Sequence, residues 1–200
     1  MYANAISLVG TERGVGVNNA GNIGMSTGSL SISTSGRIQN TGTLNGSSVS
    51  LKTQRDIENK GNMIASNSIA VRSVGGIDNI GSIRGNTSLS VSTQNKLLNK
   101  DSIEARQSVS INSSNVLSNK RGRIDSGGAI SINASKGVEN FYGRIHSGSS
   151  MSINTGGTLN NMCNGKRSCG IMSDGALSVH ARKVDTKDAF IGAKGKPQYK

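Results

Sequence analysis

The chain has 200 residues, a formal net charge of +12 and few large side chains: it contains no Trp, three Tyr and two Phe, and 33% of its residues are hydrophobic. Because globular domains usually contain roughly 45–50% apolar residues, this composition excludes a thick core and leaves a narrow, repetitively packed core or disorder. The positive charge predicts attraction to polyanions. However, neither stacking aromatics nor a groove-reading helix is indicated, so no specific nucleic acid is expected.

The N-terminal residues 1–5 lack the basic and apolar regions of a secretory signal peptide. The chain also contains no run of eighteen apolar residues, the length that a transmembrane helix requires. We therefore expect neither a signal peptide nor a transmembrane segment in this sequence.

From the N-terminus onward, the chain repeats a triplet in which two apolar residues flank a small one. Such alternation predicts a short strand with one buried face. The triplets begin at Ile6, Leu30, Val49, Ile69, Leu89, Val109, Ile130, Met151 and Leu177.

Each triplet is accompanied by two further apolar positions and a recurring Asn. An apolar residue precedes the Asn by two positions, and another apolar residue follows it. The Asn residues, spaced 19 to 21 apart, are Asn19, Asn40, Asn59, Asn79, Asn99, Asn119, Asn140 and Asn161. The apolar residues that follow them are Ile23, Leu44, Met63, Ile83, Ile103, Ile124, Ile145 and Ile171.

Three short strands within about 20 residues are typical of one rung of a parallel β-helix. The patterns of leucine-rich repeats and of calcium-binding β-rolls are absent, as is the Gly at every third position that collagen requires. We predict an all-β, right-handed parallel β-helix of about eight rungs over residues 1–184. The Asn residues should form an inward-facing column whose amides hydrogen-bond the next rung, because unpaired polar groups are costly in an interior.

Two cysteines, Cys163 and Cys169, lie in a region where one repeat exceeds its neighbours by five residues. Cysteines that close a short polar insertion, here residues 162–170, predict a disulfide in an oxidising compartment. A zinc site that includes His180 is the alternative, although structural zinc sites favour closer cysteines and need a fourth ligand.

Two other patterns resemble catalytic sites. Residues 24–28, Gly-Met-Ser-Thr-Gly, match the serine-hydrolase nucleophile pattern, but no helical pattern follows to form the required elbow. Glu58 and Asp78 should occupy the same outward position on adjacent rungs, an arrangement that a glycosidase could use. A solvated, charge-balanced face is the simpler interpretation.

Basic residues gather in two places that are candidates for contact with sulfated or carboxylated glycans. The candidate residues are Lys120, Arg121, Arg123, Arg182 and Lys183. Residues 185–200 have no counterpart of the Asn repeat and contain the sole proline, Pro197. We therefore predict that the chain leaves the helix near residue 185 as a basic tail.

The Ile-x-Asn-x-Gly step, seen from Ile38 to Gly42 and from Ile57 to Gly61, resembles the filamentous haemagglutinin repeats of two-partner secretion exoproteins. This family includes large adhesins and contact-dependent growth inhibition proteins. Residues 1–28 look like the junction between the family's secretion domain and its first repeats, and the Cys-closed loop also looks familiar from such shafts. The Asn-Pro motifs of the secretion domain and a C-terminal toxin domain are missing from this sequence.

The resemblance implies a segment of a longer exoprotein that is secreted to the bacterial surface through an outer-membrane transporter. We predict a non-enzymatic shaft segment without a cofactor, with adhesion to glycans or receptors of host or neighbouring cells through its basic faces. A polysaccharide-processing β-helix enzyme and a non-functional fragment of a longer gene remain as alternatives. Carboxylates clustered in a groove would favour the enzyme.

Overall fold

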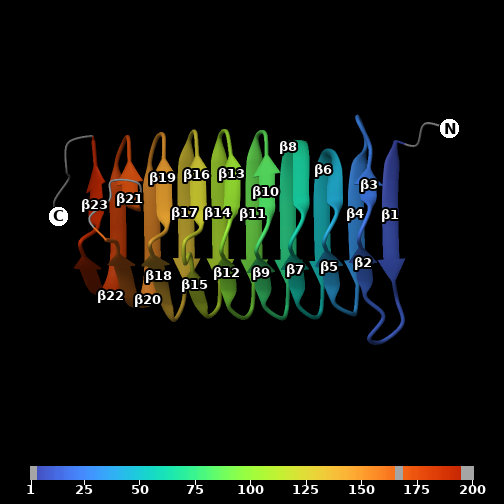
Figure 1. Ribbon diagram of the computed structural model, residues 1–200, viewed down its shortest axis with the longest axis horizontal. Coiled ribbons are helices and arrows are strands. Elements are labelled where there is room, and N and C mark those ends of the chain that lie inside the picture. Colours follow the sequence, from blue (N-terminus) through green and yellow to red (C-terminus); the bar gives the residue numbers. More distant parts are fainter. Residues whose placement is uncertain (1–3, 165–168, 195–200) are drawn as a thin grey trace.

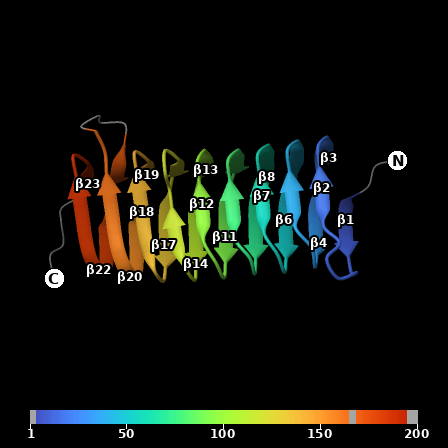
Figure 2. The same cartoon turned by 60° about the horizontal axis from the view of Figure 1, so that its bottom comes forward.

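The computed structural model describes residues 4–164 and 169–194, and all regular structure in these ranges is β-strand. The chain winds into a parallel β-solenoid of about nine turns, with about 21 residues per turn (Figure 1). β1 and β23 lie at opposite ends of the stack (Figure 2). The predicted parallel β-helix is therefore confirmed, with one turn more than the eight rungs expected.

Each turn contributes three strands, and each strand pairs in parallel with its equivalents in neighbouring turns. The first strands of the turns contain the apolar–small–apolar triplets. They are β1 (Ala5–Gly10), β4 (Ser29–Thr34), the C-terminal halves of β6 (Thr43–Thr53) and β8 (Asn62–Ser73), β11 (Ser88–Thr93), β14 (Ser108–Ser113), β17 (Ala129–Ala134) and the N-terminal halves of β20 (Met151–Met162) and β22 (Leu177–Lys187).

The second strands lead to the Asn positions and the third strands follow them. The second strands are β2 (Val17–Asn19), β5 (Ile38–Asn40), β7 (Ile57–Asn59), β9 (Ile77–Asn79), β12 (Leu97–Asn99), β15 (Val116–Ser118), β18 (Gly137–Phe141) and the ends of β20 and β22. The third strands are β3 (Asn22–Gly24), the starts of β6 and β8, β10 (Ser82–Gly85), β13 (Ser102–Ala105), β16 (Arg123–Ser126), β19 (Arg144–Ser147), β21 (Gly170–Ser173) and β23 (Phe190–Ala193).

The core consists of apolar columns that run along the solenoid axis. Successive side chains of a strand point to opposite faces, so the two apolar residues of each triplet point inward and the small residue between them points outward. Leu89 and Val91, for example, are buried and pair in register with Ile69 and Val71 of the turn before. Because every turn repeats this arrangement, the core stays narrow and is filled without Trp or any buried Phe among the described residues.

One interior column is polar. The structure places all eight predicted Asn residues in it, and the side-chain Nδ2 of each from Asn19 to Asn140 donates to Oδ1 of the Asn in the following turn at 2.7–2.8 Å. The amide also donates to backbone carbonyls beside the column, as Asn79 does to Ser102 O at 3.0 Å. The amides from Asn40 onward are fully buried, and this paired arrangement satisfies groups that would be costly if left unpaired.

A second set of buried polar groups lies at the end of the first strands. Hydroxyl groups there donate to carbonyl oxygens at the equivalent corner of the preceding turn. Ser73 Oγ lies 2.5 Å from Arg55 O, and Ser113 Oγ lies 2.8 Å from Asn95 O. The small Ser and Thr residues at this corner thus form hydrogen bonds between turns as well as saving space.

The corner that follows each ladder position varies in length. It takes four residues after each Asn from Asn19 to Asn99, five after Asn119, Asn140 and Thr186, and ten after Asn161. In two of the four-residue corners, a Cβ on Gly42 or Gly61 would lie within 2.0 Å of a carbonyl oxygen of the adjacent turn, and only glycine fits such a close approach. In the five-residue corners the second residue takes a left-handed φ instead, at Arg121 (60°), Tyr142 (57°) and Asp188 (51°).

The prediction that the chain leaves the helix near residue 185 is wrong. β22 continues to Lys187, and β23 pairs with β21, with Ile191 beside Ile171 in the third apolar column. Thr186 occupies the position of the recurring Asn, beside Asn161, so the ninth turn lacks the residue that marked the others. Residues 195–200 of the predicted tail lie outside the described residues.

The ladder predicts that an interior Asn is much harder to replace than its outward neighbour. Asn79→Ala leaves the amides of Asn59 and Asn99 without one partner each, so we expect the free energy of unfolding to fall by roughly 1–3 kcal/mol. Asp78→Ala, an exposed position in the same strand, should stay within about 0.5 kcal/mol of the unmodified protein. Urea denaturation of both variants would measure this, and equal losses would contradict the assigned role of the ladder.

Candidate functional site

The outward face of the third strands bears charged side chains on successive turns. Parallel register places Ile64, Arg84, Glu104, Asp125 and His146 in one outward column, each beside the next. These residues are about 20 positions apart in the sequence and become direct neighbours only because the turns stack without slipping. The column therefore brings together groups that no local motif connects.

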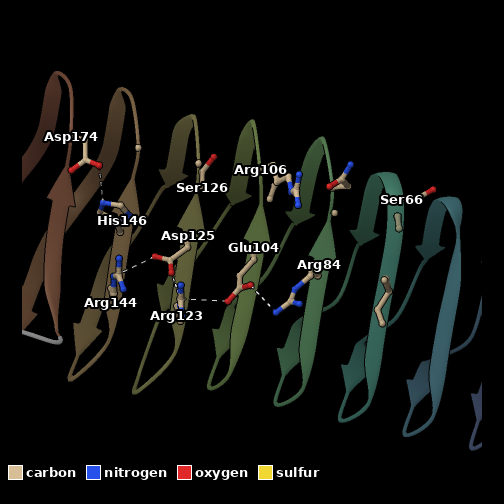
Figure 3. Close-up of a pocket in the computed structure, with 17 residues that line it drawn as sticks. Ser66, Arg84, Glu104, Arg106, Arg123, Asp125, Ser126, Arg144, His146 and Asp174 are labelled. Carbon is tan, nitrogen blue, oxygen red and sulfur yellow. Dashed lines mark hydrogen bonds and ion pairs between the residues drawn. The ribbon is translucent and has the colours of Figure 1, made fainter.

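Figure 3 shows a chain of ion pairs in which the carboxylates of this column alternate with arginines, two of which, Arg123 and Arg144, come from the neighbouring outward column. Arg84 Nη2 lies 3.1 Å from Glu104 Oε2, and Arg123 Nε lies 3.4 Å from Glu104 Oε1. Arg123 also contacts Asp125 Oδ2, whose other oxygen, Oδ1, lies 3.5 Å from Arg144 Nε. Both oxygens of each carboxylate thus face a guanidinium group.

A second ion-paired group continues the row toward the C-terminus. His146 Nε2 lies 3.4 Å from Asp174 Oδ2, and Lys194 Nζ lies 2.8 Å from Asp174 Oδ1. The pKa of Asp174 is lowered from its ordinary value, chiefly by the hydrogen bond from Lys194, with a further contribution from His146 and an opposing effect of desolvation. Asp174 is therefore held as a carboxylate between two basic groups.

These side chains border a groove of 1220 Å³ that extends along the solenoid from Ile64 to Asp174. Small residues in the third strands and directly after them also line it, among them Ala65, Gly85 and Gly127. Arg106 also lines the groove, is exposed, and forms no ion pair with the described residues. The result is an elongated polar depression parallel to the axis, which the sequence analysis did not predict.

The carboxylate pair that the sequence did suggest lies elsewhere. Glu58 and Asp78 are neighbours in register on the second strands, as expected, but their surroundings differ. Asp78 is exposed, whereas Glu58 is 9% exposed because Arg37, Lys60 and Gln39 surround its carboxylate, with oxygen–nitrogen distances of 2.6, 2.5 and 3.0 Å. Glu58 is thus part of a local ion-pair cluster on the outer surface and not of the solvated face that we expected.

The five basic residues predicted to contact glycans lie at separate positions on the solenoid. Lys120 and Arg121 are exposed at the corner between β15 and β16, whereas Arg182 lies within β22, between its first-strand and second-strand halves, in the last turn. Lys183 Nζ lies 3.4 Å from Asp185 Oδ2, and Arg123 is ion-paired in the groove wall. The structure therefore brings only Arg123 of this set into the groove, and the other four do not form one patch with it.

The two cysteines, His180 and residues 24–28 are the remaining candidates from the sequence. Cys163 and Cys169 form a disulfide with a Cα–Cα distance of 6.1 Å at the corner between β20 and β21, and residues 165–168 of this loop lie outside the described residues. His180 is an exposed residue of β22. Among the described residues, no group of three or more His, Cys, Asp or Glu side chains could hold a metal ion. Residues 24–28 form a bend between two strands, without the strand-to-helix elbow of a serine hydrolase.

Comparison with known proteins gives one partial match. A segment of 62 residues, 30% of this chain, is 45% identical to a protein from Yersinia pestis named Toxin CdiA. The match spans 2% of that protein's length. No protein-family model and no solved structure matches the chain. Within the described ranges, no helix is long and apolar enough to cross a membrane.

The Glu58 cluster predicts a pH-dependent contribution to stability. Its pKa is lowered from the ordinary value of 4.5, chiefly by the hydrogen bond from Lys60, while burial opposes the shift. A lowered pKa in the folded state means that the stabilisation is present above the unfolded pKa and is lost as the pH falls through the folded pKa. Glu58→Gln should therefore lower the free energy of unfolding by about 1 kcal/mol near neutral pH and by progressively less below pH 4.5.

Asp78→Asn provides the matched control, because it removes the same charge from the next position of the same column. We expect it to change the free energy of unfolding by less than about 0.5 kcal/mol at any pH. Urea denaturation from about pH 7 to about pH 3 would measure both variants. An equal effect of the two substitutions, or a Glu58→Gln effect that is independent of pH, would contradict the prediction.

The disulfide predicts a local effect of reduction. Stability in a repeat array is roughly a sum of local and nearest-neighbour contributions, so breaking the Cys163–Cys169 bond should leave the flanking turns folded. They are held by buried columns such as Ile132 and Ile153, which pair in register. Alkylation and mass spectrometry should detect two thiols after reduction, and hydrogen exchange should show unchanged protection in β17 and the first half of β20. Loss of protection throughout these strands would show that the disulfide supports the whole C-terminal half.

Proposed function

We propose that this chain is a non-enzymatic shaft segment of a secreted exoprotein of the filamentous haemagglutinin type. The observation that carries the proposal is the repetition of one buried Asn ladder through eight successive turns. Catalysis needs one arrangement of groups at one place, whereas a shaft needs the same arrangement at every level. The similarity of 62 residues to Toxin CdiA supports the same assignment.

A solenoid of this kind suits a shaft because its length is independent of its cross-section. Each turn contacts only its neighbours, so adding turns extends the rod by about 4.8 Å each without a larger core. The same apolar and Asn columns connect every pair of adjacent turns. On this proposal the chain is exported and displayed on the bacterial surface, with an outer-membrane two-partner transporter acting on a secretion domain elsewhere in the parent protein.

The carboxylates of the groove give little support to an enzymatic function. Glu104 and Asp125 are adjacent, yet guanidinium groups face all four of their oxygens. Glycosidases need one carboxyl group that donates a proton and a second that attacks or activates water, and two carboxylates neutralised by arginines do not divide these roles. The described groove lining contains no Phe, Tyr or Trp, the rings that usually stack on a sugar, and its one aromatic ring is the imidazole of His146.

Removal of one complete turn tests the shaft proposal. Deletion of residues 77–96 joins Gly76 to Leu97 and places Asn59 beside Asn99, because Leu97 and Ile77 are equivalent in register. We expect the shortened protein to fold, with its longest dimension by small-angle X-ray scattering reduced by about 5 Å. Deletion of residues 77–86 is the control, since half a turn destroys the register and should abolish cooperative unfolding.

Failure of the whole-turn deletion to fold would contradict the modular shaft. Release of reducing ends from a polysaccharide, lost in the Glu104→Gln variant, would contradict the non-enzymatic assignment and favour the enzyme instead.

A further inference from the structure

We propose that the groove along the third strands binds a linear acidic polysaccharide, in which sugar units carry carboxylate or sulfate groups. This inference goes beyond the shaft proposal and is independent of it, because a shaft needs no ligand. It rests on the hydrogen-bonding capacity of the groove, on its direction and on its length.

The groove offers many more donors than acceptors. Both carboxylate oxygens of Glu104, Asp125 and Asp174 lie within 3.5 Å of a basic nitrogen, which compensates their charge. Asp125 Oδ1 forms no hydrogen bond with the described residues, but both it and Asp174 Oδ1 are buried, so they are not accessible acceptors for a ligand. Each guanidinium group has five N–H donors, and only one nitrogen each of Arg84 and Arg144 takes part in these pairs. A ligand that enters the groove therefore meets an excess of donors and must supply acceptors.

The arginines are also accessible. The side chains of Arg84, Arg123 and Arg144 are 63%, 54% and 37% exposed, whereas those of Glu104 and Asp125 are 21% and 11% exposed. The carboxylates thus lie beneath the guanidinium groups and orient them, while the positive groups face solvent. Arg106, exposed and without an ion pair among the described residues, adds a further cation at the groove. Carboxylate and sulfate groups are strong acceptors for such forked donors.

The direction of the groove selects a linear ligand. Its lining comes from equivalent positions in six successive turns, beginning with Ile64 and ending with Asp174, so a bound polymer would lie along the rod axis. Successive turns are separated by about 4.8 Å, which is close to the length of one pyranose unit in an extended glycan.

The exposed cations outside the groove are a weaker candidate for ligand binding. Lys120 and Arg121 lie at an outward corner beside the exposed Tyr142, and neither belongs to the lining of a groove. Single-stranded nucleic acid is disfavoured in the groove, since its binding sites combine cations with aromatic side chains on which bases stack. The described groove lining has four arginines but no Phe, Tyr or Trp, and its one aromatic ring is the imidazole of His146.

Binding can be tested on the full chain with size-defined oligosaccharides. The probes are an oligogalacturonate hexamer, a heparin-derived hexasaccharide, a neutral maltohexaose and a single-stranded oligonucleotide of matched charge, measured by isothermal titration calorimetry. We expect the acidic saccharides to bind and maltohexaose not to bind. The acidic saccharide that binds more tightly identifies carboxylate or sulfate as the preferred group.

Two charge-matched double variants locate the site. Arg84→Gln with Arg106→Gln removes two cations from the groove and leaves Glu104 paired with Arg123. Lys120→Gln with Arg182→Gln removes two exposed cations outside the groove. We expect the groove variant to lose roughly tenfold or more in affinity, as loss of charge-assisted hydrogen bonds does, and the control variant to lose less than about twofold.

Equal losses in the two variants would overturn the inference, because they would indicate attraction by net charge alone. Equal binding of the oligonucleotide, or no binding of either acidic saccharide, would overturn it as well. None of these outcomes affects the turn-deletion experiment, so failure of the groove and failure of the shaft are distinguishable. Unchanged circular dichroism spectra would show that both variants fold.

Discussion

A primary amide inside a protein must have its N–H and oxygen groups paired, and in this solenoid the side-chain partners of each ladder amide come from the adjacent turns. Asn79 accepts from Asn59 and donates to Asn99, and a shift of one residue in either neighbour would turn those side chains outward. The apolar columns alone would tolerate some slippage, since Ile, Leu and Val are interchangeable partners. The ladder therefore determines the register, and the register determines every other neighbour in the molecule.

The charged face is a direct consequence of this register. When turns stack without slipping, residues one period apart become neighbours, and like charges in an outward column would repel along the whole rod. On the third strands Arg84 pairs with Glu104 in register. Glu104 and Asp125 are neighbours of like charge, and Arg123, from the adjacent outward column, forms ion pairs with both. The net charge of +12 is thus compatible with local ion pairing along this face. This ion pairing also leaves the outer ends of the arginine side chains exposed to solvent and ligands.

The inward half of the molecule could be predicted from the sequence, and the outward half could not. Inward positions repeat the same residue type, so Asn40, Asn59 and the triplets revealed the period, the strands and the column without structural information. Apart from the small residue of each triplet, outward positions repeat no type, and their pairing appears only when equivalent residues are aligned turn by turn. Glu58 was therefore expected on a solvated face, although Arg37 from the turn before and Lys60 beside it cover its carboxylate. The ninth turn was missed for a related reason, since Thr186 replaces the Asn that defined the others.

The corner after the ladder varies most in length between turns, and this explains how the shaft can vary while its ladder stays intact. Four residues separate Asn79 from Ile83, five separate Asn119 from Ile124, and ten separate Asn161 from Ile171. The five-residue corners absorb the extra residue through a left-handed conformation two positions after the ladder, as at Arg121 and Asp188.

The disulfide-closed insertion begins at the same place, with Cys163 two positions after Asn161. The second and third strands on either side of this corner remain paired, with Asn161 beside Asn140 and Ile171 beside Ile145. Insertions at this corner therefore change the surface of the rod without moving the columns. Loops there, and charges in the outward columns, are the parts of such a solenoid that can acquire separate binding properties while the interior continues to stack.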